Sequence, residues 1–77
     1  MAHKVIDWHA VGRRLRMERK ARGLTLEEAA EGCGVWLGMT VGNWEAGKVK
    51  PRLENLKKIC QLYGCALDDI FNSRGEE

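Results

Sequence analysis

The chain has 77 residues, of which 44% are hydrophobic and 31% are charged. This length allows one compact core, so we expect a single domain over residues 1–77, ordered over about 7–72 and with short flexible tails. No apolar run approaches the roughly 18 to 20 residues that a membrane span needs, and the first residues lack the apolar block of a secretory signal. These features exclude a membrane protein and favour a cytoplasmic one.

The charges are distributed unevenly, although the formal net charge is only +2. Six cations and one anion lie within residues 13–22, and Lys48, Lys50 and Arg52 form a second basic cluster, whereas the C-terminal end is acidic. A basic patch on a small domain is typical of phosphate binding, because released counterions supply most of the non-specific affinity for nucleic acid. A solvated helix face is the alternative, and for charge runs taken alone it is the more common one.

No pattern for metal binding, a cofactor or catalysis is evident. Cys33, Cys60 and Cys65 form no close C-x-x-C pair, and His3 and His9 lie far from them in sequence, so we expect packed thiols in a reducing compartment. There is no glycine-rich phosphate loop and no nucleophile with a base at a meaningful spacing. We therefore expect no enzymatic activity, no metal, no cofactor and no small-molecule ligand.

Hydrophobic spacing predicts helices throughout and no convincing strand. Asp7 is a plausible N-cap for a first helix that runs to about Arg22, with Trp8, Val11 and Leu15 on one face.

The cations of this helix divide between two positions. At about 100° per residue, Arg13, Arg16 and Lys20 fall together on the face opposite the apolar one, whereas Arg19 lies at the margin of the apolar stripe. Arg19 is therefore placed to pair inward.

A capping box of Thr25 and Glu28 predicts the start of a second helix. The residues expected to face the core from this helix are Leu26, Ala29, Ala30 and Cys33. A fourth helix is expected to begin at Pro51 and end at Gly64, with its apolar side made by Leu53, Leu56, Ile59, Cys60 and Tyr63. A short fifth helix with Leu67, Ile70 and Phe71 then caps the core.

The third helix is predicted over about Leu37 to Glu45, with Leu37, Val41 and Trp44 facing inward. Its outward face collects Trp36, Met39, Gly42 and Asn43.

Two features of this segment leave alternatives open. Gly38 and Gly42 each cost a helix interior about 0.8 to 1 kcal/mol relative to alanine, which suggests a close backbone approach, although a helix that starts late and is locally weak is an equal alternative. Trp36 is either exposed beside Met39 as part of an apolar patch, or turned into the core.

Three segments together carry a family resemblance. They read V-G-R-R-L-R-M-E-R-K-A-R-G-L-T-L-E-E-A-A from Val11, then V-G-N-W-E-A-G-K-V-K-P, then L-E-N-L-K-K-I-C-Q-L-Y-G-C-A-L-D-D-I-F to Phe71. Over about four fifths of its length, the chain resembles the phage-repressor and Cro (Xre-type) helix-turn-helix family. The resemblance implies an all-α fold, a compact five-helix bundle of the repressor-like type.

The resemblance also implies roles for individual residues. In this family the second helix packs across the phosphate backbone and the third enters the major groove. The base-reading positions correspond to Gly38, Met39, Thr40 and Asn43. The family's frequent glutamine at the start of the second helix, a phosphate ligand, corresponds to Leu26. A buried ion pair between the first and third helices maps onto Arg19 and Glu45.

Two functional hypotheses follow. The first is a DNA-binding transcriptional regulator, a repressor that binds paired half-sites in double-stranded DNA as a homodimer; its phosphate contacts are Arg13, Arg16, Lys20, Lys48 and Lys50. The second is a degenerate helix-turn-helix antiactivator that binds a partner transcription factor, and not DNA, through the outward face of the third helix. The contact residues for either partner are Trp36, Gly38, Met39, Thr40, Gly42 and Asn43.

Overall fold

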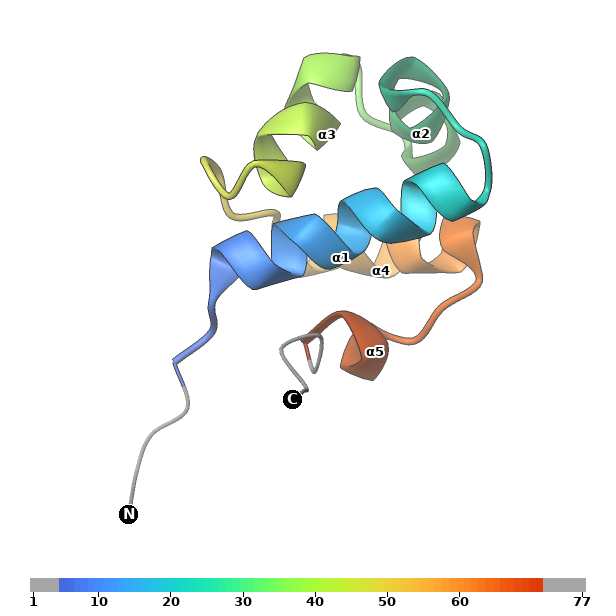
Figure 1. Cartoon of the computed structure of the whole chain (residues 1–77). Coiled ribbons are helices and arrows are strands. Elements are labelled where there is room, and N and C mark those ends of the chain that lie inside the picture. Colours follow the sequence, from blue (N-terminus) through green and yellow to red (C-terminus); the bar gives the residue numbers. More distant parts are fainter. Residues whose placement is uncertain (1–4, 72–77) are drawn as a thin grey trace.

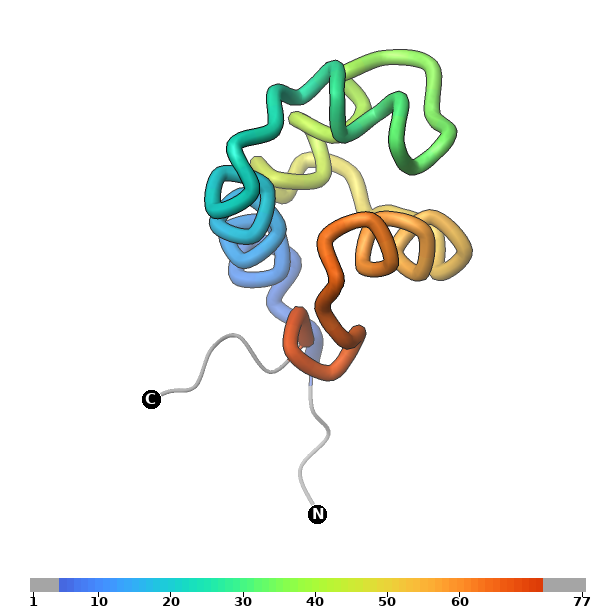
Figure 2. Tube along the Cα trace, turned by 90° about the vertical axis from the view of Figure 1, so that its right-hand side faces the viewer, coloured from blue at the N-terminus to red at the C-terminus, as the bar shows by residue number. Residues whose placement is uncertain are grey.

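Residues 5–71 are described by a computed structural model, and they form five α-helices and no strand. The helices are α1 (Trp8–Ala21), α2 (Leu26–Cys33), α3 (Gly38–Glu45), α4 (Leu53–Tyr63) and α5 (Leu67–Phe71). α1 and α4 lie on opposite sides of the core, α2 and α3 cover one end of it, and α5 closes the other (Figures 1 and 2). The all-α, five-helix prediction is confirmed.

Local signals in the sequence set the starts of the first two helices. The Asp7 side chain accepts hydrogen bonds from the backbone N–H groups of His9 (3.0 Å) and Ala10 (3.2 Å), which begins α1. At α2 the Glu28 N–H donates to Thr25 Oγ1 (3.0 Å), and the Thr25 N–H donates to Glu28 Oε1 (2.8 Å). The predicted capping box is therefore present.

All five helices contribute buried residues to the core. Its buried residues are Val11, Leu15, Ala29, Ala30, Cys33, Val41, Trp44, Leu56, Ile59, Cys60, Tyr63 and Ile70. Trp8 and Phe71 pack against its edge, with their rings perpendicular and their centroids 6.1 Å apart. This contact fixes α5 to the start of α1.

Three details of the predicted helices are wrong. Leu37 is 59% exposed, because it is the N-cap of α3 and its extended backbone does not follow the helical face. Leu53 is 56% exposed, since the buried stripe of α4 begins only at Leu56. Pro51 is buried but lies before the N-cap Arg52, so α4 begins two residues later than predicted.

The three cysteines are free, with Cys33 and Cys60 buried and Cys65 half-buried. Burial raises the pKa of the Cys33 thiol and is the largest cause that raises the pKa of Cys60 to about 12. Both thiols are therefore protonated near neutral pH. Within residues 5–71 there is no group of three or more His, Cys, Asp or Glu side chains that could hold a metal ion, and no helix long and apolar enough to cross a membrane.

Candidate functional site

The turn between α2 and α3 places the residues on which both functional hypotheses depend. Gly34 ends α2 in the left-handed conformation at φ 81°, which glycine adopts without steric cost. The Val35 N–H donates to the Ala30 carbonyl at 2.9 Å, and this bond holds the start of the turn against α2. The turn then continues to Leu37, the N-cap of α3.

Trp36 lies at the outer edge of this turn and is 98% exposed. Of the two alternatives for its side chain, exposure is the one that the structure has. Met39, in the first turn of α3, is 69% exposed, and Leu37 lies between these two residues in sequence. Trp36, Leu37 and Met39 are thus three exposed apolar side chains within four residues at the N-terminal end of α3, and we call them the Trp36 surface.

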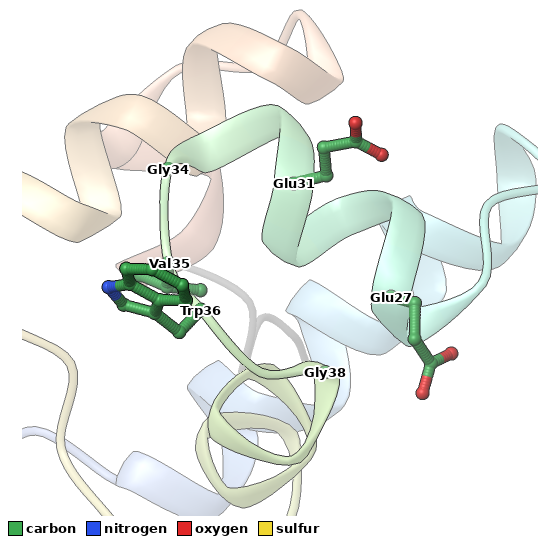
Figure 3. A pocket seen from close by; sticks show the side chains of 6 residues that line it. All are labelled: Glu27, Glu31, Gly34, Val35, Trp36 and Gly38. Atoms are coloured by element: carbon green, nitrogen blue, oxygen red, sulfur yellow. The ribbon is translucent and has the colours of Figure 1, made fainter.

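A hollow of about 400 Å³ opens beside Trp36, between α2 and the start of α3. Figure 3 shows its six lining residues, which are Glu27, Glu31, Gly34, Val35, Trp36 and Gly38. The Trp36 ring lies on one side of the hollow and α2 lies on the other, with the side chains of Glu27 and Glu31 extending away from the ring. Sequence reasoning missed these glutamates, although their spacing of four residues in a helix signals that they share a face.

Gly38 is buried, and its close neighbour is Glu27 of the same chain. A Cβ atom at Gly38 would lie 2.9 Å from the Glu27 carboxylate oxygen Oε2 and 3.0 Å from the Glu27 backbone nitrogen. The close approach expected at this glycine is therefore the packing of α2 on α3. Gly38 is not an open position for a DNA base or a partner, because α2 covers it.

The middle of α3 presents the polar groups expected to read bases. Thr40, Gly42 and Asn43 are half-buried. A Cβ atom at Gly42 would meet only Leu26, at an ordinary contact distance of 3.4 Å, so this position is open. The Asn43 carbonyl accepts hydrogen bonds from the N–H groups of Lys48 (3.0 Å) and Val49 (3.3 Å), which folds the segment after α3 back against the helix.

The C-terminal end of α3 is held by an ion pair. Arg19 Nε donates to Glu45 Oε2 at 2.7 Å and Arg19 Nη2 donates to Oε1 at 3.0 Å, while Nη1 donates to the Leu24 carbonyl at 2.8 Å. The side chains are only 11% and 6% exposed. The hydrogen bond to Glu45 is the largest cause that raises the pKa of Arg19. The structure thus brings together the two residues that the face analysis and the resemblance paired, and the arginine also ties down the α1–α2 turn.

A glycine allows α1 to cross this end of α3. Gly12 is buried, and a Cβ atom there would lie 2.5 Å from the Trp44 carbonyl oxygen and in conflict with the Glu45 carbonyl. Because these are backbone atoms, neither can move aside without shifting a helix. Sequence reasoning gave Gly12 no role, although a glycine inside a predicted helix is the signal for such a contact.

The cations named as phosphate contacts are all exposed. They are Arg13, Arg16, Lys20, Lys48 and Lys50. Gly47 packs on His9 at the first turn of α1, since a Cβ there would lie 2.5 Å from the His9 ring, and the Lys50 ammonium lies 6.0 Å from the centroid of the Trp8 ring. The segment that carries Lys48 and Lys50 therefore lies against the first turn of α1, beside the C-terminal end of α3.

Two further cations of the basic run are already paired within the chain. Arg14 and Arg22 form ion pairs with Glu18 at 2.7 Å and 2.6 Å. The hydrogen bond from Arg14 is the largest cause that lowers the pKa of Glu18. Their pairing reduces the charge that the run offers to a ligand.

The comparisons with known proteins identify the two-helix unit. The family model described as Helix-turn-helix matches residues 15–70. The chain belongs to this helix-turn-helix family. Its closely packed α2 and α3, joined by the turn after Gly34, correspond to the two helices that give the family its name.

The chain is similar to a curated transcriptional regulator over three quarters of its length. It is 40% identical over 58 residues to the uncharacterized HTH-type transcriptional regulator YobD of Bacillus subtilis (strain 168), a match that covers 75% of this chain and 51% of that protein. The chain thus spans about half the length of this curated relative.

Solved structures give the same picture. The restriction-modification controller protein C.AhdI from Aeromonas hydrophila is similar with a TM-score of 0.79 and 31% identity, over 84% of this chain and 97% of that one. The clp gene regulator ClgR from C. glutamicum has a TM-score of 0.81 and 27% identity, over 95% and 92% of the two chains. The P22 c2 repressor, solved with a synthetic operator, has a TM-score of 0.77 over 82% and 94%; at 24% identity it shows the fold alone. These proteins are described as regulators and not as enzymes.

Proposed function

We propose that this protein is a DNA-binding transcriptional regulator that places α3 in the major groove. The observation that carries the proposal is the exposure of Lys48 and Lys50 beside the C-terminal end of α3, with further exposed cations along α1. Clustered lysine and arginine side chains supply the electrostatic part of DNA affinity. The names of the similar proteins, which describe a transcriptional regulator and a gene regulator, support the same function.

The proposed contacts divide into two kinds. Asn43 can bond an adenine edge in a bidentate manner, and Thr40 can donate or accept a hydrogen bond, while Met39 can touch a thymine methyl group. Lys48 and Lys50, with the exposed cations of α1, bind phosphates and set the position of α3 without reading sequence. We further propose that the protein acts in the cytoplasm as a repressor and binds paired half-sites as a homodimer.

The test is a titration of the protein with the DNA upstream of its own gene and with a scrambled duplex of equal length, at several salt concentrations. We expect a strong preference for the native fragment and an affinity that falls steeply as salt rises. An equal affinity for both duplexes would contradict sequence-specific regulation. Absence of binding to either duplex at low salt would contradict DNA binding altogether.

A second candidate function is that of an antiactivator, in which α3 occupies a partner transcription factor instead of DNA. The observation that favours it is the 98% exposure of Trp36 beside Met39 and Leu37, because exposed apolar patches mark interaction surfaces. In that case Trp36→Ala abolishes capture of the partner and Asn43→Ala has little effect. If instead Asn43→Ala weakens DNA binding and Trp36→Ala leaves it unchanged, the protein is a DNA-binding regulator.

A further inference from the structure

The turn at the C-terminal end of α4 brings two cysteines together. Gly64 ends this helix in the left-handed conformation at φ 73°, and the chain turns back on itself there. The Cys65 N–H donates to the Cys60 carbonyl at 3.0 Å, and the Gly64 N–H donates to the Gln61 carbonyl at 3.3 Å. These two bonds define a Schellman motif, in which the side chains of the residues joined by the longer loop are commonly in contact.

The side chains of Cys60 and Cys65 interact as this motif leads us to expect. Burial is the largest cause that raises the pKa of Cys60 to about 12, and the charge of Cys65 and a hydrogen bond between the two side chains add to it. Cys60 is a buried member of the core, and Cys65 packs against the edge of the same core.

The backbone geometry of the pair suits a disulfide. A disulfide needs two α-carbons about 4.4 to 6.8 Å apart. The hydrogen bond between Cys65 and Cys60 joins a nitrogen and an oxygen that are one and two covalent bonds from their own α-carbons. The two α-carbons are therefore held close together without any rearrangement of the helix end.

The two sulfur atoms differ in their access to solvent. Cys65 is half-buried, whereas Cys60 is only 3% exposed. A small oxidant therefore reaches Cys65 first, and the Cys60 thiol is the next sulfur that the oxidised atom meets. We propose that hydrogen peroxide converts Cys60 and Cys65 to an intramolecular disulfide, which reversibly ties the end of α4 to the connection that leads to α5.

The reaction has two steps. The Cys65 thiolate attacks one oxygen of the peroxide, the O–O bond breaks, and Cys65 becomes a sulfenic acid while hydroxide leaves and takes up the proton that Cys65 released. The Cys60 sulfur then attacks the Cys65 sulfur, the S–O bond breaks, and the departing hydroxide takes the Cys60 proton. Each sulfur loses one electron, and the peroxide is reduced to two molecules of water. A dithiol reductant reverses the change.

The third cysteine is placed differently. Cys33 lies at the end of α2, is 2% exposed, and donates from Sγ to the Ala30 carbonyl at 3.7 Å. Burial raises the pKa of its thiol. Peroxide has no direct access to this sulfur, so Cys33 is expected to stay reduced while the pair at the end of α4 is oxidised.

The disulfide acts on the attachment of α5. Ala66 alone separates Cys65 from α5, which docks on α1 through the perpendicular Trp8 and Phe71 rings. A covalent link at Cys65 restricts the unfolded chain and so stabilises the folded one. The connection between α4 and α5 lies on the opposite side of the molecule from the segment after α3 (Figure 1). The inference therefore goes beyond DNA binding and does not rest on it.

The test treats the full chain with hydrogen peroxide, stops the reaction with catalase, and blocks the remaining thiols with N-ethylmaleimide in urea before tryptic digestion and mass spectrometry. Cleavage after Lys58 and Arg74 gives a peptide of residues 59–74, which holds both cysteines of the pair and not Cys33. We expect this peptide to lose two hydrogen atoms and carry no maleimide, and to regain both thiols with dithiothreitol. The Cys33 peptide is expected to carry maleimide throughout.

Variants and a melting curve complete the test. Cys65→Ser and Cys60→Ala are each expected to abolish the disulfide, and Cys33→Ala is the matched control that keeps it. Cys65→Ser suffices if thermal melting shows that Cys60→Ala does not fold. The oxidised unmodified chain is expected to melt roughly 5 °C or more above the reduced one, because the link shortens the free loop of the unfolded state.

Four results would overturn the inference. Peroxide leaves both thiols of the 59–74 peptide free, or oxidises Cys65 to a sulfinic acid without forming the disulfide, or produces disulfides to Cys33 or between chains. The fourth is an oxidised chain that melts at or below the temperature of the reduced one. The DNA titration described above is carried out on the reduced chain, so a failure of one proposal is distinguishable from a failure of the other.

Discussion

At the C-terminal end of α3 the backbone of Trp44 and Glu45 lies directly against Gly12 of α1, and a bidentate ion pair with Arg19 fixes the helix. At the N-terminal end the chain leaves Trp36 almost fully exposed and caps the helix with Leu37, which has no side-chain hydrogen bond. One helix thus has a packed, basic-flanked end and an open, acidic and apolar end. The difference indicates that the first end positions α3, whereas the second is free to bind.

The largest expected effect comes from breaking the ion pair at the packed end. Arg19→Ala or Glu45→Ala leaves one charge nearly buried and unpaired, which costs roughly 3 to 5 kcal/mol of the free energy of unfolding. Urea unfolding measures this loss. Arg13→Ala, at an exposed position of the same helix, is the control and should stay within about 0.5 kcal/mol. A loss below about half a kcal/mol for both partners would show that the pair behaves as an exposed one.

The helix crossing at Gly12 gives the next effect. Gly12→Ala places a methyl group against backbone atoms of α3, and overpacking of this kind costs roughly 1 to 3 kcal/mol. Gly32→Ala is the matched control, because its methyl group meets only the flexible end of the Leu62 side chain and alanine favours the helix by about 0.8 to 1 kcal/mol. Equal stability losses in the two variants, measured by thermal melting, would mean that α1 and α3 are not closely packed.

The third prediction concerns Asn43, which lies in the middle of α3 between its packed and open ends. Asn43→Ala is expected to cost about 1 to 3 kcal/mol of affinity for the native duplex and to relax preference at one base pair. A fluorescence-anisotropy titration with the native duplex and single-site variants measures both. If the affinity for every duplex falls by the same factor, Asn43 does not read a base.

The smallest stability effect is expected at the open end. Trp36→Ala should change the free energy of unfolding by less than about 0.5 kcal/mol, because the side chain is 98% exposed. Trp44→Ala is the comparison, since that side chain is 3% exposed and its removal costs roughly 3 to 5 kcal/mol. Similar losses in the two variants would place Trp36 in the core and withdraw the Trp36 surface.

The side-chain positions at the packed end of α3 could be predicted from the sequence, whereas those at the open end could be predicted only in part. Helical periodicity fixes the direction of side chains inside helices, which is why the buried positions of Leu15, Val41 and Trp44 and the inward position of Arg19 were predicted. Periodicity says nothing about a loop, so the same reasoning left Trp36 between core and surface and placed Leu37 inside.

The close contacts of the glycines could be found only from the three-dimensional structure. A sequence shows that Gly12 and Gly38 weaken their helices, but the backbone that each one meets belongs to another helix. For the same reason the hollow between α2 and Trp36 was not predicted, because its two sides are joined by a turn whose path the spacing of apolar residues does not define.

The division of α3 into two ends is tested most directly by the salt dependence of DNA binding in three forms of the protein: the unmodified chain, Lys48→Ala and Trp36→Ala. Lys48 flanks the packed end, so its removal should weaken all duplexes alike and lower the slope of log affinity against log salt by about 1. Trp36→Ala should leave both the slope and the affinity unchanged. Loss of DNA binding in Trp36→Ala together with an unchanged slope in Lys48→Ala would contradict this account, because Trp36 would then contact DNA and Lys48 would bind no phosphate.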